Sequence, residues 1–251
     1  TKTGTWYYKL TEDTTGLDAN NWKVSGNDGV IAVDVKDVNG QLVATVTPKT
    51  VTNDYTAKST TVDPTQTDFG LKDVTASDPT HAATSFDFTL TEVADAQGTP
   101  IASGAYTDSA TVSYAAKQTG VQRVGFQAIT YTKTGTWYYK LTEDTTGLDT
   151  SVWTVKDNDG VIAVDVVDNN GQLVATVTPK TVTNDYKAKQ TDVDPTKVDF
   201  ANKKVTASDP SFAATDFDFT LTEVDAQGNP VAGGLTDSAK VSYAAKQTGV
   251  Q

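Results

Sequence analysis

The sequence contains no cysteine and no methionine, and only one of its 251 residues is a histidine. Without cysteine, the chain can form neither a disulfide nor a thiolate metal site, and it has no thiol nucleophile. A single histidine cannot supply a multi-histidine metal site or repeated acid–base pairs. These absences predict that the chain holds no metal, and nothing in the sequence indicates a cofactor.

Positive charge and long apolar runs are also scarce. The chain has 20 Lys and Arg residues against 32 Asp and Glu residues, which gives a formal net charge of −12 and a pI near 4.4. So acidic a chain repels the phosphates of nucleic acids and of anionic lipids. No apolar run approaches the roughly 20 residues that span a bilayer, and no signal peptide or sorting signal is recognisable. We expect no nucleic-acid partner, no membrane insertion, and a soluble interior piece or mature fragment.

The most informative feature present is an internal repeat. Thr1–Tyr55 reappears as Thr132–Tyr186 with 47 of 55 positions identical. The match continues at an offset of 131 that falls to 129, and it ends at Gln122 and Gln251. Only Arg123–Tyr131 (RVGFQAITY) occurs once. A repeat of this length is a whole domain, so the sequence predicts domains in tandem whose product is length and spacing.

Each repeat has the hydrophobic pattern of strands. Thr136–Glu143 and Phe217–Glu223 alternate between apolar and polar residues, whereas no segment shows an apolar stripe of helical period. Asn158–Gly160 and Asn169–Gly171 each precede a β-branched run, as hairpin turns do. Several short strands separated by Gly, Pro and Asn turns predict an all-β fold of tandem Ig-like β-sandwich domains.

Two positions of the domain boundary fit the repeat. One places domains at 1–122 and 132–251, with Arg123–Tyr131 as the linker. The other places a complete domain at 57–190, between the C-terminal half of a repeat at 1–56 and the N-terminal half of the next at 191–251. Arg123–Tyr131 alternates like a buried strand with an irregularity, while the polar, Thr-rich segment Tyr55–Asp68 is typical of an interdomain connection. We favour the second boundary.

Four motifs follow one another within the period of the repeat. They are Lys203–Thr206 with the strand Phe217–Phe219, then Val124–Glu143, then the hairpin Asp165–Val177, and last Val182–Tyr186. In this order they resemble the pilin isopeptide-linkage domains of Gram-positive surface proteins. The departure is Val182, with its twin Val51, where the family usually has Phe. The resemblance covers the whole repeat, and it implies a pilin-type β-sandwich.

The resemblance also implies a spontaneous amide cross-link between a lysine on the first strand and an asparagine on the last, promoted by a glutamate on a middle strand. In the complete repeat these residues are Lys72, Asn184 and Glu143. The flanking halves carry the remaining members, which are Glu12, Asn53 and Lys203. The reaction is a single turnover of the chain on itself, so no enzymatic activity is expected.

The residues themselves are compatible with this chemistry. Lys72 shares its strand face with Val74, and Asn184 shares its face with Val182, so both are expected to point inward. Burial lowers the pKa of an amine, and a neutral amine is a nucleophile. A semi-buried ion pair between lysine and glutamate explains the same pattern without any reaction. Other glutamates on the apolar faces of strands, Glu92 and Glu223, are rivals for the promoting role.

Three other signals carry less weight. His81 aligns with Phe212 of the other copy, so we expect a surface or edge position without a function common to the repeats. The Asp/Asn clusters lack the spacing of a calcium loop and are explained by hairpin turns. Four tryptophans could stack on sugars, although tryptophan in a sandwich more often packs in the core; they are Trp6, Trp22, Trp137 and Trp153.

The sequence therefore favours a structural module, the stalk or shaft of a bacterial adhesin or pilus, stabilised by Lys–Asn isopeptide bonds. Its expected location is the extracellular, cell-wall-anchored surface, with the anchor outside this segment. The expected partners are neighbouring repeats and, through the terminal halves, other copies arranged head to tail. The alternative is a repeat that itself binds a host glycan or a host surface protein.

Overall fold

The computed structural model describes residues 2–209 and 211–251. Among these residues there are twenty strands and no helix, and therefore no helix that could cross a membrane. The chain divides into two compact units, Thr1–Lys189 and Gln190–Gln251, which are described separately below. The predicted all-β class is confirmed.

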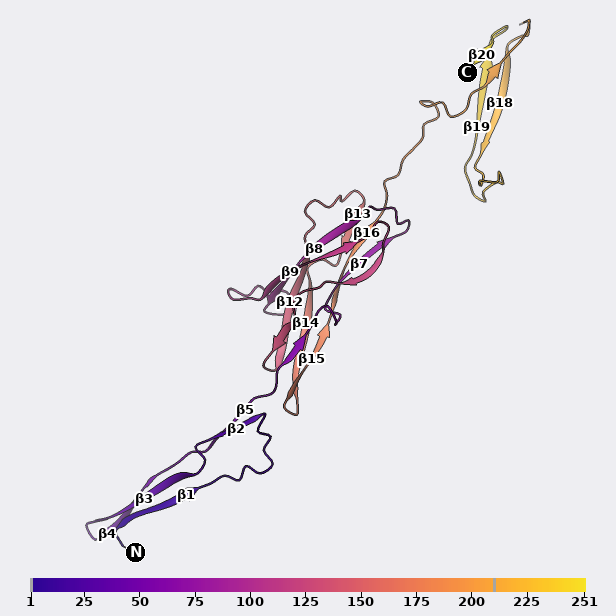
Figure 1. The fold of residues 1–251 in the computed structure, drawn as a ribbon. Coiled ribbons are helices and arrows are strands. Elements are labelled where there is room, and N and C mark those ends of the chain that lie inside the picture. The colour runs from indigo at the N-terminus through magenta and orange to yellow at the C-terminus, as the bar shows by residue number, and fades with distance from the viewer. Residues whose placement is uncertain (1, 210) are drawn as a thin grey trace. The chain divides into compact units, whose positions relative to one another are not determined.

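Residues 60–186 of the first unit form a β-sandwich (Figure 1). One sheet has the strand order β15-β14-β12-β8-β9, the other has the order β10-β7-β16-β13, and β6 pairs with β11. β7 and β16 are parallel, while the other paired strands are antiparallel. The strands are β6 (Thr60–Val62), β7 (Gly70–Ala76), β8 (Thr84–Val93), β9 (Thr107–Tyr114), β10 (Gly120–Arg123), β11 (Ile129–Tyr131), β12 (Gly135–Glu143), β13 (Trp153–Lys156), β14 (Gly160–Asn169), β15 (Gln172–Thr178) and β16 (Lys180–Tyr186).

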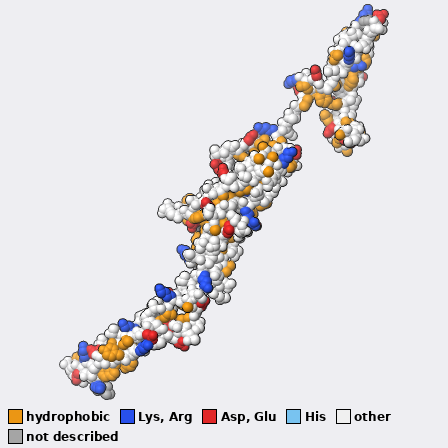
Figure 2. Space-filling view, in the orientation of Figure 1, with side chains coloured by type: hydrophobic (Ala, Val, Ile, Leu, Met, Phe, Trp, Pro, Cys, Tyr) orange, Lys and Arg blue, Asp and Glu red, His pale blue; other side chains and the backbone are white. Residues whose placement is uncertain are grey.

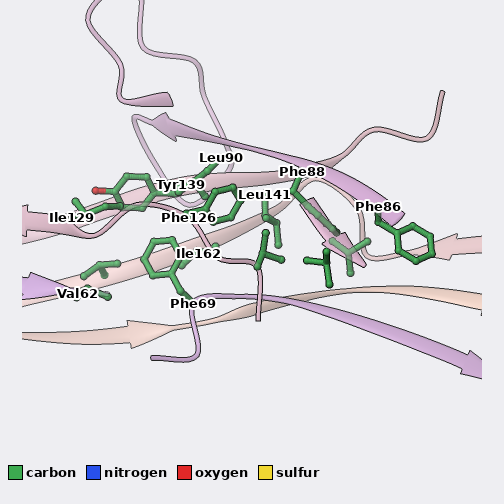
Figure 3. Close-up of a cluster of buried hydrophobic side chains, with 14 of the residues drawn as sticks. Val62, Phe69, Phe86, Phe88, Leu90, Phe126, Ile129, Tyr139, Leu141 and Ile162 are labelled. Atoms are coloured by element: carbon green, nitrogen blue, oxygen red, sulfur yellow. The ribbon is translucent and has the colours of Figure 1, made fainter. Parts of the chain in front are cut away.

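A single apolar core fills the space between the two sheets (Figure 3). Alternation along the strands builds it: on β8, Phe86, Phe88 and Leu90 are buried, while Asp87 and Thr89 between them are exposed. The buried residues of this core all fall between Val62 and Val182 of the sequence. The segment that occurs only once in the sequence contributes four of them, which are Val124, Phe126, Ile129 and Tyr131.

Three segments outside the long strands can be compared with the sequence prediction: the turn at Asn170 and Gly171, Arg123–Tyr131, and Tyr55–Asp68. Asn170 and Gly171 have φ values of 53° and 88° and join β14 to β15 as a two-residue hairpin turn, as predicted. Arg123–Tyr131 alternates between buried and exposed residues and is irregular, because only Ile129–Tyr131 of its second half pairs as a strand. Tyr55–Asp68 is not a connection throughout its length. Thr60–Val62 within it pairs with β11, since Val62 belongs to the core.

The N-terminal half, residues 1–56, carries five strands of the first unit. They are β1 (Gly4–Leu10), β2 (Trp22–Ser25), β3 (Gly29–Val38), β4 (Gln41–Thr47) and β5 (Thr52–Tyr55), in a sheet β1-β3-β4 and a pair β2-β5. Asn21 is 6% exposed, and its Nδ2 donates to the Gly171 carbonyl at 2.7 Å and to the Thr56 carbonyl at 2.9 Å. The Tyr55 hydroxyl donates to Asp168. These contacts form a joint between this half and the hairpin turn of the sandwich.

The second unit consists of two antiparallel strand pairs. They are β17 (Lys204–Val205) with β20 (Gly249–Val250), and β18 (Thr215–Thr222) with β19 (Thr236–Tyr243). The equivalent segments of the other copy form β7, β10, β8 and β9 in the sandwich, where β7 likewise pairs with β10 and β8 with β9.

Candidate functional site

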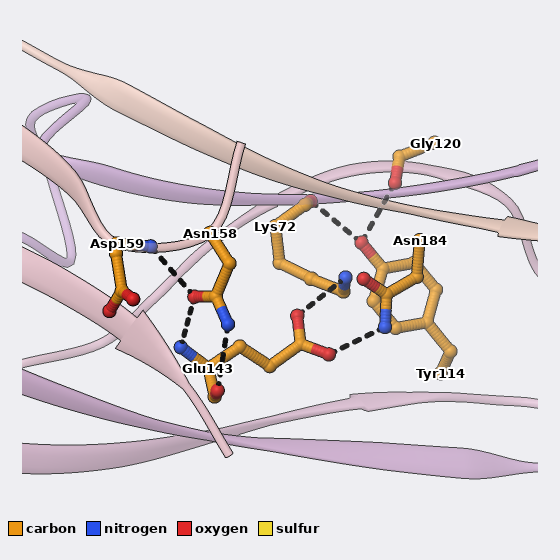
Figure 4. Close-up of polar contacts among 7 residues, drawn as sticks. All are labelled: Lys72, Tyr114, Gly120, Glu143, Asn158, Asp159 and Asn184. Carbon is orange, nitrogen blue, oxygen red and sulfur yellow. Dashed lines mark hydrogen bonds and ion pairs between the residues drawn. The ribbon is translucent and has the colours of Figure 1, made fainter. Parts of the chain in front are cut away.

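Three polar side chains lie together inside the sandwich (Figure 4). Lys72 and Asn184 are 0% exposed, and Glu143 is 2% exposed. A polar group at such a depth without a partner costs about 2 kcal/mol or more. The three residues proposed from the resemblance are therefore brought into one buried cluster, which we call the core triad.

Strand pairing determines where the core triad lies. On the parallel strands β7 and β16, Lys72 stands opposite Val182, and Asn184 stands opposite Val74. Lys72 and Asn184 are thus offset by two residues in register, and side chains offset by two project from the same face of a sheet. Glu143 is the last residue of β12 in the facing sheet, so the core triad bridges the two layers.

The carboxylate of Glu143 holds the other two side chains. Lys72 Nζ donates to Glu143 Oε2 at 2.9 Å, and Asn184 Nδ2 donates to Glu143 Oε1 at 2.5 Å. Asn184 Oδ1 is buried and accepts no hydrogen bond from the described residues. Buried oxygens are nearly always paired, so this carbonyl stands out as an exception. The Lys72 amine and the Asn184 carboxamide thus each donate a hydrogen bond to a different carboxylate oxygen of Glu143.

Neighbouring groups fix the geometry of the core triad. Asn158 holds the backbone of Glu143 by accepting from its N–H at 2.7 Å and donating to its carbonyl at 3.0 Å. The Tyr114 hydroxyl donates to the Lys72 carbonyl at 2.8 Å, and Lys72 Nζ lies 4.3 Å from the centre of the Phe86 ring. The hairpin pattern of the sequence predicts only a turn role for Asn158. Its twin Asn27 makes the same pair of bonds to Glu12, at 2.7 and 3.1 Å.

Burial changes the protonation of the amine. Desolvation lowers the pKa of Lys72 below its ordinary value of 10.5, and the hydrogen bond and charge of Glu143 only partly offset this effect. Burial also raises the pKa of Tyr114 to about 12, so its hydroxyl remains a donor. At a given pH, a larger fraction of the Lys72 amine is therefore neutral than of a surface lysine. The amine also lies beside Glu143, whose carboxylate can take its proton.

Comparison with known protein families bears on the same residues. A model of the Spy0128-like isopeptide containing domain (FctA) matches residues 69–203, which is more than half of the chain and includes all of the core triad. The chain belongs to this family. A search of curated proteins finds no match. Membership of the Spy0128-like family agrees with the pilin resemblance and with the β-sandwich.

The rival glutamates are not part of the core triad of this Spy0128-like domain. Glu92 Oε2 accepts from the backbone N–H of Tyr106 at 3.1 Å, and Glu223 Oε2 accepts from the N–H of Leu235 at 2.8 Å. These two bonds are equivalent in the two copies and stabilise the same loop. The glutamate that contacts the lysine is Glu143.

Residues 1–56 and the second unit each hold residues equivalent to part of the core triad. In the N-terminal half, Asn53 Nδ2 donates to Glu12 Oε1 at 2.7 Å, in an exposed position. In the second unit, Lys203 Nζ lies 4.2 Å from the centre of the Phe217 ring. Lys203 belongs to a different compact unit from Glu12 and Asn53, whereas Lys72, Glu143 and Asn184 all lie within the first unit.

The prediction for His81 was wrong. His81 is 3% exposed, and its ring nitrogens lie 2.8 Å from the Ala82 carbonyl and 3.1 Å from the Gln118 carbonyl. Its ring centre lies 5.3 Å from that of Trp153. The twin residue, Phe212, is also a flat ring, which agrees with a packing role at this position.

The tryptophans and acidic clusters give little support to ligand binding. Trp153 is 7% exposed and packs against His81, Phe86 and Tyr186. Trp137 packs against the Tyr131 ring at a centroid distance of 5.0 Å. Among residues 2–209 and 211–251, no group of three or more metal-ligating side chains is close enough to hold an ion.

Proposed function

We propose that Lys72 and Asn184 become joined by an isopeptide bond and that Glu143 promotes the reaction. The observation that carries this proposal is the hydrogen-bonded core triad, in which one buried carboxylate contacts both the amine and the carboxamide. A merely structural ion pair would not need a buried asparagine whose carbonyl oxygen has no partner among the described residues.

The proposed chemistry is an aminolysis of a carboxamide. Glu143 takes a proton from the Lys72 ammonium, and the neutral Nζ attacks Cγ of Asn184. In the tetrahedral intermediate, Glu143 gives this proton to the departing nitrogen Nδ2 and takes the second proton from Nζ, so the carboxyl group of Glu143 ends protonated. The Nζ–Cγ bond forms, the Cγ–Nδ2 bond breaks and one ammonia leaves. The chain becomes lighter by about 17 Da, the mass of the ammonia released in this displacement.

We further propose that residues 57–190 are the complete repeat and that the halves at 1–56 and 191–251 belong to neighbouring repeats. Support comes from the core, whose buried cluster falls between Val62 and Val182. Strand pairing also supports this frame, because the first and last long strands of this segment, β7 and β16, are neighbours. In the alternative frame, the partners Lys72 and Asn184 would lie in different domains.

The biological role proposed for such repeats is the stalk of a bacterial cell-surface adhesin or pilus. A bond between β7 and β16 would let a pulling force pass from one end of the domain to the other without entering the residues between Lys72 and Asn184. Membership of the Spy0128-like family supports an extracellular, structural role. The absence of cysteine means that disulfides cannot provide this reinforcement.

Mass spectrometry of the intact, folded chain tests the cross-link. The expected mass is about 17 Da below that calculated from the sequence, through the loss of one ammonia. A protease digest should contain one branched peptide that joins the segments around Lys72 and Asn184. A chain of full calculated mass, or a digest with both segments free, would refute the proposal.

A further inference from the structure

The only histidine of the chain has both of its ring nitrogens against carbonyl oxygens. His81 lies in the loop between β7 and β8, and it is 3% exposed. Its Nδ1 lies 2.8 Å from the carbonyl oxygen of Ala82, and its Nε2 lies 3.1 Å from that of Gln118. Gln118 belongs to the turn between β9 and β10, so the imidazole connects two loops of the sandwich.

These two contacts require a hydrogen on each ring nitrogen. A carbonyl oxygen only accepts hydrogen bonds, and a neutral imidazole has one N–H and one bare nitrogen that is itself an acceptor. In a neutral ring, one of the two contacts would therefore place a lone pair against an oxygen, at 2.8 or at 3.1 Å. The imidazolium form has two N–H groups and satisfies both carbonyls. The contacts of His81 are therefore those of the charged ring.

The surroundings of the ring supply aromatic groups instead of a carboxylate. The ring centre of His81 lies 5.3 Å from that of Trp153 and 5.5 Å from that of Tyr186. A cation within about 6 Å of an aromatic ring is attracted by the π electrons. Figure 2 shows acidic and basic side chains dispersed over the surface, and none of the ion pairs among the described residues includes His81.

Few titratable groups lie on the elements that pack against this ring. β13 contributes Trp153, which does not titrate, and β16 contributes the phenol of Tyr186. Lys117 in the turn between β9 and β10 is exposed, and so is Asp78 in the loop that carries His81. Histidine is the side chain that ordinarily changes its charge between about pH 5 and pH 8. The imidazole is therefore the group whose charge varies here near neutral pH.

The other copy of the repeat shows which contacts depend on the imidazole. Its equivalent residue is Phe212, whose carbonyl accepts from the Lys246 N–H at 3.1 Å. The His81 carbonyl likewise accepts from the Lys117 N–H at 3.0 Å. One backbone hydrogen bond thus joins the loop to the turn in both copies. Phenylalanine has no side-chain donor, so the two bonds from the ring belong only to the copy with histidine.

We propose that His81 is a pH-sensitive latch of the central sandwich. Its imidazolium form ties the loop between β7 and β8 to the turn between β9 and β10, and the tie weakens when the ring releases its proton. The ring also packs against Tyr186, the last residue of β16, so the latch acts at the end of the sandwich where the chain leaves that strand. This device does not depend on the cross-link between Lys72 and Asn184.

Two opposing effects decide whether the folded chain holds the proton. Burial disfavours a charged ring, because the ring gives up its hydration. The two bonds to carbonyl oxygens act in the other direction, since a hydrogen bond from a charged donor is about twice as strong as a neutral one. Loss of the proton would in addition leave a lone pair of the buried ring against an oxygen. The geometry therefore favours the charged ring.

Proton binding sets the sign of the response to pH. An exposed histidine of the unfolded chain has a pKa of about 6.5. If the folded chain holds the proton more tightly, the latch contributes its full stabilisation below about pH 6.5 and loses it as the pH rises and the folded ring becomes neutral. Acid conditions thus close the latch, and alkaline conditions open it.

The variant His81→Phe tests the latch, because phenylalanine occupies the same position in the other copy. Calorimetry of the full wild-type and variant chains gives their melting temperatures from about pH 5 to pH 8. The melting temperature of the wild type minus that of the variant should fall by about 3–5 °C over this range, the value of one hydrogen bond in a domain of this size. The other titratable groups are common to both chains. A difference that stays constant, or that rises with pH, overturns the proposal.

Nitrogen NMR of the chain labelled in histidine measures the protonation of the ring directly. Since the chain has one histidine, the spectrum reports this ring alone. At pH 7 most folded chains should carry a hydrogen on both ring nitrogens, whereas most chains unfolded in urea should carry one. A folded ring that is mostly neutral at pH 7 overturns the proposal. The loss of ammonia, which reports on Lys72 and Asn184, should be the same in both chains, so the proposed function and this inference can fail separately.

Discussion

Replacing Glu143 by glutamine should prevent the cross-link while leaving the shape of the core almost unchanged. Glutamine fills the same volume, but it cannot take a proton from Lys72 as the carboxylate does. In the native chain, Lys72 Nζ lies 2.9 Å from Glu143 Oε2, so the carboxylate is the group in place to accept that proton. The Glu143→Gln chain is expected to keep the ammonia that the wild type loses.

The size of the stability change follows from the loop that the bond closes. Lys72 and Asn184 enclose a little over 100 residues, and an entropic model assigns a cross-link of that span about 4.7 kcal/mol. A domain of this size loses about 3–5 °C of melting temperature for each kcal/mol. The melting temperature of the Glu143→Gln sandwich should therefore fall by about 14–24 °C.

Intact-mass spectrometry and calorimetry of the same sample measure both effects. The matched control is Glu92→Gln, since Glu92 lies on the neighbouring strand β8 and accepts from the Tyr106 N–H instead of contacting Lys72. The control should lose ammonia as the wild type does. Normal loss of ammonia in Glu143→Gln, or failure of the control to lose it, would refute the role assigned to Glu143.

Three further predictions concern charge, force and the joint. In Asn184→Ala the amine of Lys72 stays free, and burial keeps its pKa in the folded state below 10.5. Between the folded pKa and 10.5 the unfolded state therefore binds more protons than the folded state. In this pH window the free energy of unfolding, measured by urea titration, should rise with pH relative to wild type. In single-molecule stretching, Glu143→Gln should release about 400 Å of chain, at up to 3.6 Å per residue, that the cross-linked wild type withholds. Gly171→Ala should lower the melting temperature more than Gly40→Ala, because both glycines have positive φ but only at Gly171 would a new Cβ meet a neighbouring side chain.

Alternation and repetition made much of the fold and of the core triad predictable. The strand Thr136–Glu143 places Tyr139, Leu141 and Glu143 on one face, and all three are buried. A polar residue on such a face needs a partner, but Glu92 and Glu223 lie on apolar faces as well, so alternation alone does not single out Glu143. The family resemblance identifies Glu143 together with Lys72 and Asn184, which periodicity alone could not, because the three residues lie on strands far apart in sequence.

Contacts specific to one copy of the repeat could not be predicted in this way. Asn21 binds the carbonyl of Gly171, 150 residues further along the chain, and no local pattern points to such a contact. His81 is buried among aromatic rings because the position accepts a flat side chain, whereas its difference from Phe212 suggested a surface site. Asn158 was interpreted as a turn residue, and its side chain in fact fixes the backbone of Glu143.

The joint around Gly171 has a consequence for how an array of these repeats would bend. The Asn21 amide closes this joint with hydrogen bonds of 2.7 and 2.9 Å, but the equivalent residue of the next repeat is Val152, which has no side-chain donor. Successive joints would therefore differ in stiffness even though the domains between them are nearly identical. Bending would concentrate at the joints that lack a side-chain amide equivalent to that of Asn21. A single side chain per repeat would therefore determine which joints of the fibre are flexible.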